Sequence, residues 1–378
     1  MKVLSLFDGM ACGMLAFQSA GIEVESYDAY EIDKYAVKTA THNFPNIKER
    51  GDVFTAGFTQ YKGVDFVVGG SPCTYWSIAQ KNGRETEASG MGWELFSQYL
   101  RAVNEAQPKY FIYENNKSMS KAIRASIDKA FGFEAVFINS ALVSAQNRQR
   151  LYWVGKRNAD GTYSKVDVKQ PRDRGFTVRD ILETCESLTS SEGVVNNTIC
   201  LNSKSGRGGV EGLQPSLQDR IYSIEGKSPA VTTAFMPKVA VPIRVGTYPR
   251  SDGAMINCQS WRIYGVNGKS TNLNANGGGQ GAKTGLYAIP SKEQGYEVKD
   301  GFISIKGKQY PIKLADGYYI IRKLTVTECK RLQTVPEWYE FPVSNAQAYK
   351  MLGNGWTVEV IAHLIKSALS NQTKEEPR

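Results

Sequence analysis

The sequence lacks the features that would point to a membrane, a secreted compartment or a bound metal. No apolar run approaches the ~18 residues that a transmembrane helix requires, and Asp8 places an acidic group too early for a signal peptide. No C-x-x-C pair occurs among the six cysteines, which are Cys12, Cys73, Cys185, Cys200, Cys258 and Cys329. Neither a zinc site nor a disulfide framework is expected, so we predict a soluble cytoplasmic protein without a metal.

An excess of acidic residues is absent as well. The 378 residues include 46 lysines and arginines against 37 aspartates and glutamates, for a formal net charge of +9. Basic side chains displace counterions from phosphates and so favour a nucleic-acid partner, although basic proteins without such partners are common. The length suffices for one large domain and a second, smaller one.

The amino-acid composition and the hydrophobic pattern change along the chain. Up to about residue 155, short apolar runs alternate with helical patterns, which predicts an α/β fold with a doubly wound, mostly parallel sheet. From about 158 to 318, glycine, serine, asparagine and lysine surround short β-like runs, which indicates a second, mainly β domain. Thr325 and Glu328 form a capping-box pattern that predicts a helix, and 357–369 predicts a closing amphipathic helix. The expected domains are residues 1–158 with 346–378, and residues 159–345.

A cysteine stands where a buried strand gives way to a loop. The run Phe66-Val67-Val68 predicts a strand, and Gly69-Gly70-Ser71-Pro72-Cys73 follows it. Ligands of open α/β sheets bind beyond the carboxyl ends of the strands, so Cys73 would face that crevice, with Pro72 stiffening its backbone. The alternative, a buried cysteine that acts as a small hydrophobe, is the commoner fate of this residue type. The glycines and proline around Cys73 are untypical of a core cysteine and favour a reactive thiol.

Three acidic residues follow successive predicted strands. Asp8 lies between the first strand and the first helix, Glu31 ends the second strand, and Asp52 follows Gly51. The G-x-G-x-x-G spacing is missing, which disfavours a nicotinamide-linked dehydrogenase, and Asp8 would repel a pyrophosphate but attract a sulfonium. Glu31 is placed to accept from ribose hydroxyls and Asp52 from an adenine amino group. Each acid alone is more often a solvated loop residue, but together they indicate an S-adenosylmethionine pocket.

Two further motifs bring charged side chains to the same crevice. Glu114 comes at the end of an aromatic-rich strand, where we expect it beside Cys73 against an apolar wall, as suits a general acid. Gln146, Arg148 and Arg150 alternate along another predicted strand, so both guanidiniums would point the same way, toward a carboxylate or phosphate. The alternatives are a surface glutamate and an ordinary basic edge strand.

An imperfect repeat lies in the expected second domain. Arg220-Ile221-Tyr222 is followed by Gly226-Lys227-Ser228, and Arg262-Ile263-Tyr264 by Gly268-Lys269-Ser270, at one spacing. Each copy is typical of a hairpin with a glycine-containing turn. The copies would serve either packing or the presentation of Lys227 and Lys269 to phosphates.

Taken in order, the motifs resemble those of the cytosine carbon-5 DNA methyltransferases. The matching segments are Phe7-Asp8-Gly9, Gly69 to Cys73, Glu114-Asn115, Gln146-x-Arg148-x-Arg150, the helix 324–333 and Gly353-Asn354. Leu6 to Gly9, Gly69 to Cys73 and Trp356 look closest to the mammalian de novo enzymes and to phage-borne methyltransferases. The resemblance is weakest from 158 to 318, where a target-recognition domain would lie. It implies a class I S-adenosylmethionine-dependent methyltransferase that acts as a monomer on duplex DNA in a bacterial or phage-infected cell.

The resemblance also implies a role for each matched residue. The Cys73 thiolate would add to carbon 6 of a flipped cytosine, Glu114 would protonate ring nitrogen 3, and Arg148 and Arg150 would orient the base and a nearby phosphate, while 81–93 closes as a lid. S-Adenosylmethionine, which leaves as S-adenosylhomocysteine, would be held by Phe7, Asp8, Gly9, Ala11, Cys12, Gly13, Glu31, Ile32, Asp52, Val53, Pro72, Leu95, Asn354 and Trp356. DNA would be held by Ser71, Ser77, Gln146, Arg220, Lys227, Arg262 and Lys269.

Three positions depart from the usual family pattern. Cys12 stands where many members have glycine, Ser71 stands where many have a proline, and Asn116 replaces the valine that usually follows Glu-Asn. The polar side chain of Asn116 bears on the rate and not on the reaction class. Two rival interpretations are an RNA-directed enzyme of the same fold and a non-catalytic DNA-binding homologue. The sizeable middle domain favours DNA, and the presence of Cys73, Glu114 and both arginines favours catalysis.

Overall fold

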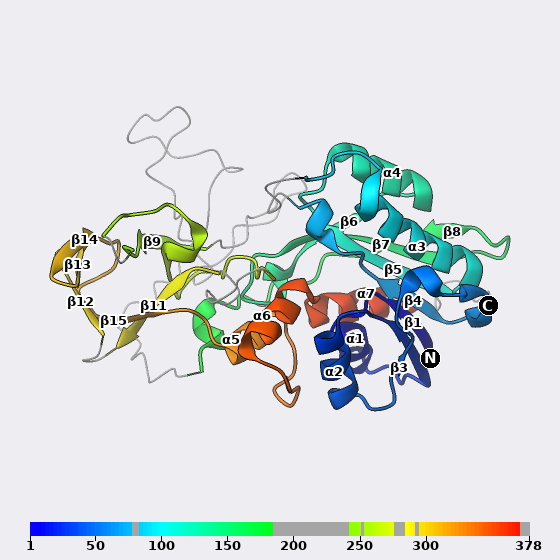
Figure 1. Cartoon of the computed structure of the whole chain (residues 1–378), viewed down its shortest axis with the longest axis horizontal. Helices are drawn as coiled ribbons and strands as arrows, with labels where there is room; N and C mark the ends of the chain where they lie inside the picture. The colour runs from blue at the N-terminus through cyan, green and yellow to red at the C-terminus, as the bar shows by residue number, and fades with distance from the viewer. Residues whose placement is uncertain (78–82, 184–241, 251–252, 276–283, 292–294, 371–378) are drawn as a thin grey trace.

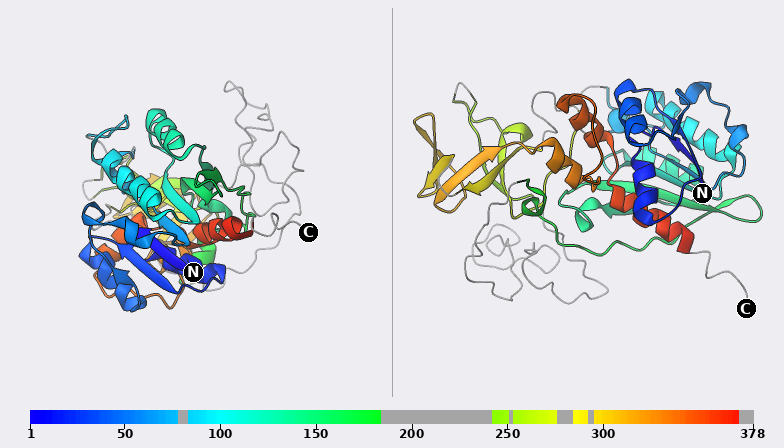
Figure 2. Two further views of the ribbon diagram at one scale, coloured as in Figure 1. Left: turned by 90° about the vertical axis from the view of Figure 1, so that its right-hand side faces the viewer. Right: turned by 90° about the horizontal axis from the view of Figure 1, so that it is seen from below.

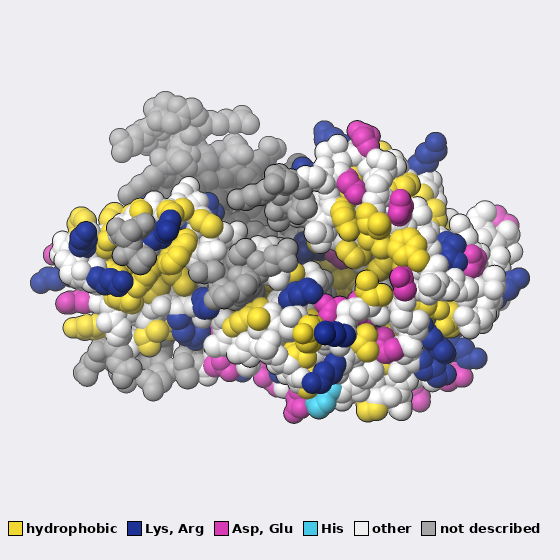
Figure 3. Space-filling model, in the orientation of Figure 1, with side chains coloured by type: hydrophobic (Ala, Val, Ile, Leu, Met, Phe, Trp, Pro, Cys, Tyr) yellow, Lys and Arg dark blue, Asp and Glu magenta, His cyan; other side chains and the backbone are white. Residues whose placement is uncertain are grey.

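Two β-sheets lie toward opposite ends of an elongated molecule, as the ribbon views show (Figure 1, Figure 2). The computed structural model describes residues 1–77, 83–183, 242–250, 253–275, 284–291 and 295–370. Within these ranges, no helix is both long and apolar enough to cross a membrane. Lysines and arginines are spread over both ends on the face drawn in Figure 3, so the positive charge is not confined to one of them.

The first sheet has the strand order β3-β2-β1-β4-β5-β7-β6, and β8 pairs with β7. Its strands are β1 (Lys2–Leu6), β2 (Ser26–Tyr30), β3 (Lys48–Glu49), β4 (Phe66–Gly69), β5 (Tyr110–Asn116), β6 (Val136–Asn139), β7 (Gln149–Arg157) and β8 (Tyr163–Lys165). Neighbours among β1 to β5 are parallel, whereas β7 is antiparallel to β5, β6 and β8. This topology confirms the predicted mostly parallel sheet.

Helices cover both faces of this sheet because side chains alternate along each strand. On β4, Phe66 and Val68 belong to the cluster that contains residues of α1 (Cys12–Ala20), α2 (Lys34–Asn43) and α7 (Val358–Ser370). Val67 belongs to the opposite cluster, with residues of α3 (Gly90–Ala106) and α4 (Lys121–Phe131). The sheet is therefore doubly wound, as predicted. The sequence of β4 is an unbroken apolar run because both faces of the strand are buried.

The second sheet has the order β14-β13-β12-β15-β11-β10-β9. Its strands are β9 (Arg244–Thr247), β10 (Arg262–Gly265), β11 (Leu286–Ser291), β12 (Tyr296–Lys299), β13 (Phe302–Ile305), β14 (Lys308–Pro311) and β15 (Gly317–Arg322). All pairs are antiparallel except β10 with β11. The predicted second, mainly β part of the chain is confirmed.

The hairpin expected at 262–270 is wrong. β10 pairs with β9 and β11, and the chain after it runs to the first sheet's side of the molecule instead of turning back. There the Ser270 amide donates to the Ala145 carbonyl at 2.6 Å, and the Asn147 amide donates to the Ser270 carbonyl at 2.9 Å. The matching copy at 220–228 lies outside the described residues.

The C-terminal helices return the chain to the first sheet. α5 (Val326–Leu332) begins at the predicted capping box, in which the Glu328 amide donates to Thr325 Oγ1 and the Thr325 amide donates to Glu328 Oε2. α6 (Asn345–Asn354) follows, and α7 packs beside α1 (Figure 2). Since β8 pairs with β7, the first sheet also extends past the expected boundary at 158.

Candidate active site

The loop that carries Cys73 lies against β5. β4 ends at Gly69, and Cys73 opens a short 3-10 turn, Cys73–Tyr75. A Cβ on Gly70 would stand 2.9 Å from the Glu114 carbonyl oxygen and 2.9 Å from Oε2, so this approach requires glycine. Cys73 is partly exposed and lines both a partly open cavity and the cleft beside it. The thiol is thus reachable from two sides.

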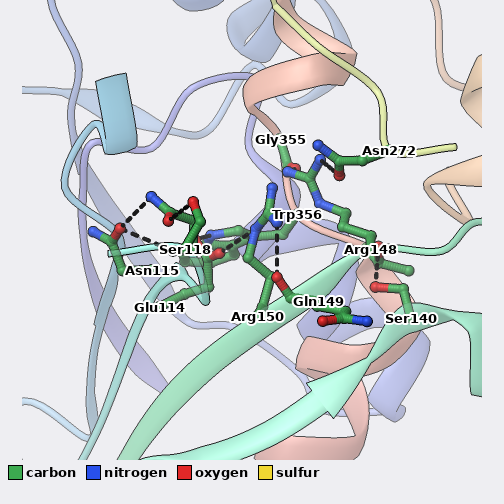
Figure 4. Close-up of polar contacts among 12 residues, drawn as sticks. Glu114, Asn115, Ser118, Ser140, Arg148, Gln149, Arg150, Asn272, Gly355 and Trp356 are labelled. Atoms are coloured by element: carbon green, nitrogen blue, oxygen red, sulfur yellow. Dashed lines mark hydrogen bonds and ion pairs between the residues drawn. The ribbon is translucent and has the colours of Figure 1, made fainter. Parts of the chain in front are cut away.

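Glu114 is held by two donors. Its carboxylate pairs with Arg150 Nε at 2.8 Å and accepts from Trp356 Nε1 at 3.0 Å (Figure 4). The side chains of Arg150 and Glu114 are only 10% and 11% exposed, so the pair is largely withdrawn from water. The expected apolar wall is wrong, because a guanidinium and an indole N–H occupy that position. Glu114 also lies within β5 and not at its end.

Arg148 has different partners from Arg150, although both line the cavity. It precedes β7, and its guanidinium donates to the carbonyls of Gly353 at 3.2 Å and Gly355 at 2.7 Å and to Asn272 Oδ1 at 3.1 Å. Burial lowers the pKa of Arg148 to about 10. Arg148 therefore joins three distant segments of the chain, as Figure 4 shows for Gly355 and Asn272.

Gln146 does not face a DNA site, which corrects its predicted role. Its side chain is fully buried, with Nε2 donating to the Leu332 carbonyl at 3.3 Å and Oε1 accepting from the Leu273 amide at 3.2 Å. Gln146 ties the first sheet's edge to segments from the second half of the chain. Gln146 also precedes β7, so it lies outside the strand along which it was expected to alternate with Arg148 and Arg150.

The loop after β1 holds a buried carboxylate. Asp8 Oδ1 accepts from Ser5 Oγ and from Tyr27 OH, each at 2.6 Å, whereas Oδ2 has no hydrogen-bond partner among the described residues. Burial raises the pKa of Asp8 to about 6. The neighbouring Gly9 amide donates to Glu31 Oε2 at 2.8 Å, and this contact ties the loop to the residue that follows β2.

Glu49 adds a third carboxylate to this end of the sheet. Both of its carboxylate oxygens are buried and have no hydrogen-bond partner within the described ranges. Burial, reinforced by the charges of Asp8 and Glu31, raises the pKa of Glu49 to about 8. Unpaired buried carboxylates are costly, so this region suits a ligand that brings positive charge or hydrogen-bond donors.

A cavity of about 230 Å³ brings most of the predicted residues together. Its predicted lining residues are Phe7, Asp8, Gly9, Cys12, Glu31, Ser71, Pro72, Cys73, Glu114, Arg148, Arg150, Asn354 and Trp356. The cavity is also lined by residues that were not predicted to belong to a site: Met10, Asp33, Ala36, Gly70, Thr74, Lys350, Met351 and Gly355. Among these, Lys350 pairs with Asp33 at 2.7 Å, and no local sequence signal links two residues so far apart in the chain.

Six predicted cofactor residues do not line this cavity: Ala11, Gly13, Ile32, Asp52, Val53 and Leu95. Asp52 instead caps the turn Val53–Thr55, where its carboxylate accepts from the Phe54 amide at 3.0 Å. Ile32 is 76% exposed beside Glu31. For these six residues, the cofactor-binding role stays a prediction.

A cleft of about 790 Å³ separates the two sheets and opens beside Cys73. Its walls are mostly uncharged and polar: Thr74, Ser77, Asn116, Ser118, Asn147, Gln149, Gln259, Thr271, Asn272 and Asn274 line it, with Lys117 and Arg150 as its cations. Of the predicted DNA-binding residues, Ser77 lies here. Ser71 is buried, and its hydroxyl hydrogen-bonds to Tyr113 OH at 2.6 Å.

Lys269 is not a DNA contact at the tip of a turn, which corrects its predicted role. It is fully buried, and Nζ donates to the carbonyls of Ala141 at 2.7 Å and Ser144 at 3.2 Å. Burial lowers the pKa of Lys269 to about 8. Arg262 is partly exposed and donates from Nε to Asn257 Oδ1 at 3.1 Å, while Arg220 and Lys227 lie outside the described residues.

Comparison with known proteins identifies relatives along the whole chain. The orphan methyltransferase M.SPRI of Bacillus phage SPR is 25% identical over 452 aligned positions, covering 100% of this chain and 99% of that protein. The type II methyltransferase M.HhaI of Haemophilus parahaemolyticus is 25% identical over 377 positions, covering 96% and 93%. Both relatives are named as methyltransferases.

Solved structures agree on the fold. The methyltransferase EhMeth of Entamoeba histolytica matches with a TM-score of 0.58 at 11% identity, covering 98% of each chain. The Dnmt2 methyltransferase of S. pombe matches with a TM-score of 0.55 at 14% identity, covering 98% of this chain and 99% of that one. The family model described as C-5 cytosine-specific DNA methylase matches residues 1–370. The chain belongs to the C-5 cytosine-specific DNA methylase family.

Proposed function

We propose that this protein transfers a methyl group from S-adenosylmethionine to carbon 5 of a cytosine in duplex DNA, with Cys73 as the nucleophile. One observation carries the proposal: Cys73 lines both the cavity and the cleft beside it, so a base entering from the cleft meets the thiol where the two adjoin. Glu114 and Arg150 line the same cavity as an ion pair.

The residues of the cavity fit S-adenosylmethionine, which supplies a methyl group activated by a sulfonium. Asp8 Oδ2 is buried and has no hydrogen-bond partner in the described part of the chain, and a buried carboxylate in that state favours a cationic ligand. Glu31 already accepts from the Gly9 amide through Oε2 and from the Ile32 and Asp33 amides through Oε1, which holds its carboxylate in place to accept from hydroxyl groups. The product is S-adenosylhomocysteine.

Cys73 supplies the covalent step. Carbon 5 of cytosine is a poor nucleophile, so the thiolate adds to carbon 6, the sulfur–carbon bond forms, and the electrons of the 5,6 double bond become available at carbon 5 as an enamine. Glu114 hydrogen-bonds the ring at nitrogen 3 and delivers a proton there, while Arg150 fixes the carboxylate. After carbon 5 has accepted the methyl group, a base removes the proton from carbon 5, the cysteine leaves as the thiolate, and nitrogen 3 returns its proton to Glu114.

The cleft accounts for the substrate. A cytosine stacked in a duplex cannot reach a thiol that lines a cleft of the protein, so the base must leave the helix at a cost of a few kcal/mol. The part of the chain from 159 to 345 serves as the target-recognition domain, and the protein works as a monomer. Ser77 and Arg262 are the predicted DNA contacts that keep accessible positions.

A methyl-transfer assay tests the proposal. Purified protein is incubated with tritiated S-adenosylmethionine and with duplex DNA or transfer RNA of matched length, beside the Cys73→Ala variant. We expect label on DNA, none on RNA, and none with the variant. Label on RNA alone would establish the RNA-directed alternative, and no label on either would establish the non-catalytic one. Bisulfite sequencing of the product then identifies the methylated site.

A further inference from the structure

A chain of hydrogen bonds runs from the Cys73 loop along the end of β5. Asn115 Nδ2 donates to the Ser71 carbonyl at 3.2 Å, and Ser71 stands two residues before Cys73. Asn116 Nδ2 donates to Asn115 Oδ1 at 3.2 Å, and Ser118 Oγ donates to Asn116 Oδ1 at 2.7 Å. Both asparagines are at most 5% exposed, so these bonds are shielded from water. Figure 4 shows Asn115 and Ser118 close to Glu114.

The hydrogen bonds of Arg84 connect the two ends of this series, so that the series forms a ring. Arg84 Nη2 donates to the Ser118 carbonyl at 2.6 Å, and its Nε donates to the Trp76 carbonyl at 3.1 Å. Trp76 in turn donates from its amide to the Cys73 carbonyl at 3.1 Å. Hydrogen bonds therefore hold the Cys73 loop at Ser71 on one side and at Trp76 on the other. The Arg84 guanidinium bonds to both of these sides, through Ser118 and through Trp76.

The segment that carries Arg84 is anchored by the same tryptophan. Glu85 Oε2 accepts from the Trp76 indole Nε1 at 3.0 Å, and the Glu85 carboxylate also accepts from the Gly92 amide. Trp76 is fully buried. Any movement of this segment therefore reaches the turn that begins at Cys73 through hydrogen bonds and packing.

We propose that Asn116 and Arg84 are positioning residues for the Cys73 thiol, an inference that rests on the proposed function of Cys73 as the nucleophile. Neither residue lines the cavity, but Asn116 lines the cleft beside it, whereas Arg84 lines neither. Arg84 therefore acts on the thiol through the ring, and coupling between the two substitutions tests whether Asn116 does so as well. Asn116 supplies two hydrogen bonds that a valine at this position cannot make. A nucleophile must be held within a narrow range of geometry, so loosening either fastening slows attack without changing which reaction occurs.

A double-mutant cycle tests the proposal. The variants are Asn116→Val, Arg84→Lys and their combination, and the measured quantity is the rate of covalent capture by a duplex that contains 5-fluorocytosine, at saturating S-adenosylmethionine. Arg84→Lys keeps the charge but replaces the two-pronged guanidinium by one nitrogen. We expect each single variant to slow capture about fivefold or more, the size of one or two lost buried hydrogen bonds, and the double variant to be about as slow as the slower single.

Matched controls separate positioning from loss of fold. Asn158→Val removes an asparagine hydrogen bond at an exposed loop, and Arg124→Lys alters an exposed ion pair on α4; both should capture at the wild-type rate. The ring variants should keep wild-type S-adenosylhomocysteine affinity, whereas a purely structural defect would lower that affinity and the thermal midpoint along with the rate.

The experiment distinguishes failure of this inference from failure of the proposed function. Wild-type rates in both single variants, or a double variant slowed by the product of the two single effects, would overturn the inference. A wild-type protein that is not captured at all would instead overturn the proposed function.

Discussion

Replacement of Glu114 by glutamine tests the ion pair at the centre of the cavity. The glutamine keeps the shape of the side chain, and its amide oxygen can still accept from Trp356 Nε1, which now donates to the carboxylate at 3.0 Å. The amide nitrogen, however, is a donor and cannot replace the oxygen that pairs with Arg150 Nε at 2.8 Å. Glu114→Gln therefore removes the charge and the proton-transfer group and preserves the packing.

The size of the effect follows from the surroundings of the pair. A positioned general acid contributes at least ~100-fold to turnover, which corresponds to about 2.7 kcal/mol of activation free energy. Breaking a buried pair costs up to about 3–5 kcal/mol of stability, but Arg150 Nη1 keeps its bond to the Gln149 carbonyl at 2.9 Å and the guanidinium borders the open cleft. We expect the lower end of that range and a folded variant.

Single-turnover methyl transfer at saturating S-adenosylmethionine measures the first effect, and thermal unfolding measures the second. Glu337→Gln is the control, since it breaks a pair with Arg331 at 2.7 Å in which the glutamate is 61% exposed, and neither residue lines the cavity or the cleft. Cofactor affinity should stay at the wild-type value. Turnover within a few fold of wild type would remove Glu114 from the mechanism.

Three other perturbations have expected outcomes. Cys73→Ala should abolish capture by a 5-fluorocytosine duplex, and an adduct with this variant would place the nucleophile elsewhere. Because the pKa of Asp8 is raised to about 6, its ionisation in the fold costs stability as pH rises from about 4 to 6. Asp8→Asn should therefore raise the thermal midpoint at pH 7.5, flatten that pH dependence and weaken cofactor binding; a lower midpoint at pH 7.5 would refute the burial argument. Lys269→Ala should destabilise the protein by about 1–3 kcal/mol, because the carbonyls of Ala141 and Ser144 lose their donor, and should leave the salt dependence of DNA binding unchanged. A shallower salt slope in Lys269→Ala would instead restore the phosphate contact.

Local patterns predicted the first sheet and the N-terminus of α5 well. Apolar runs such as Phe66 to Val68 are continuous because both faces of the strand are covered, and the Thr325–Glu328 capping box needs only four consecutive residues. Both patterns depend on neighbours in sequence, which is the information that a single chain provides.

The errors concern residues whose partners are distant. Gln146 and Lys269 read as surface groups because their types are usually exposed, yet each is buried by contacts with segments more than a hundred residues away in sequence. Glu114 was expected beside an apolar wall because its strand is aromatic, whereas its actual neighbours come from β7 and from the segment just before α7. No spacing within a single motif encodes such meetings.

The cavity is built by both ends of the chain, and this has a consequence for synthesis. One wall comes from Phe7 to Cys12, and the opposite wall comes from Lys350 to Trp356. Because translation proceeds from the N-terminus, the segment that carries Cys73 is made long before the second wall. A growing chain therefore lacks one wall of the cavity until the segment from Lys350 to Trp356 has been made.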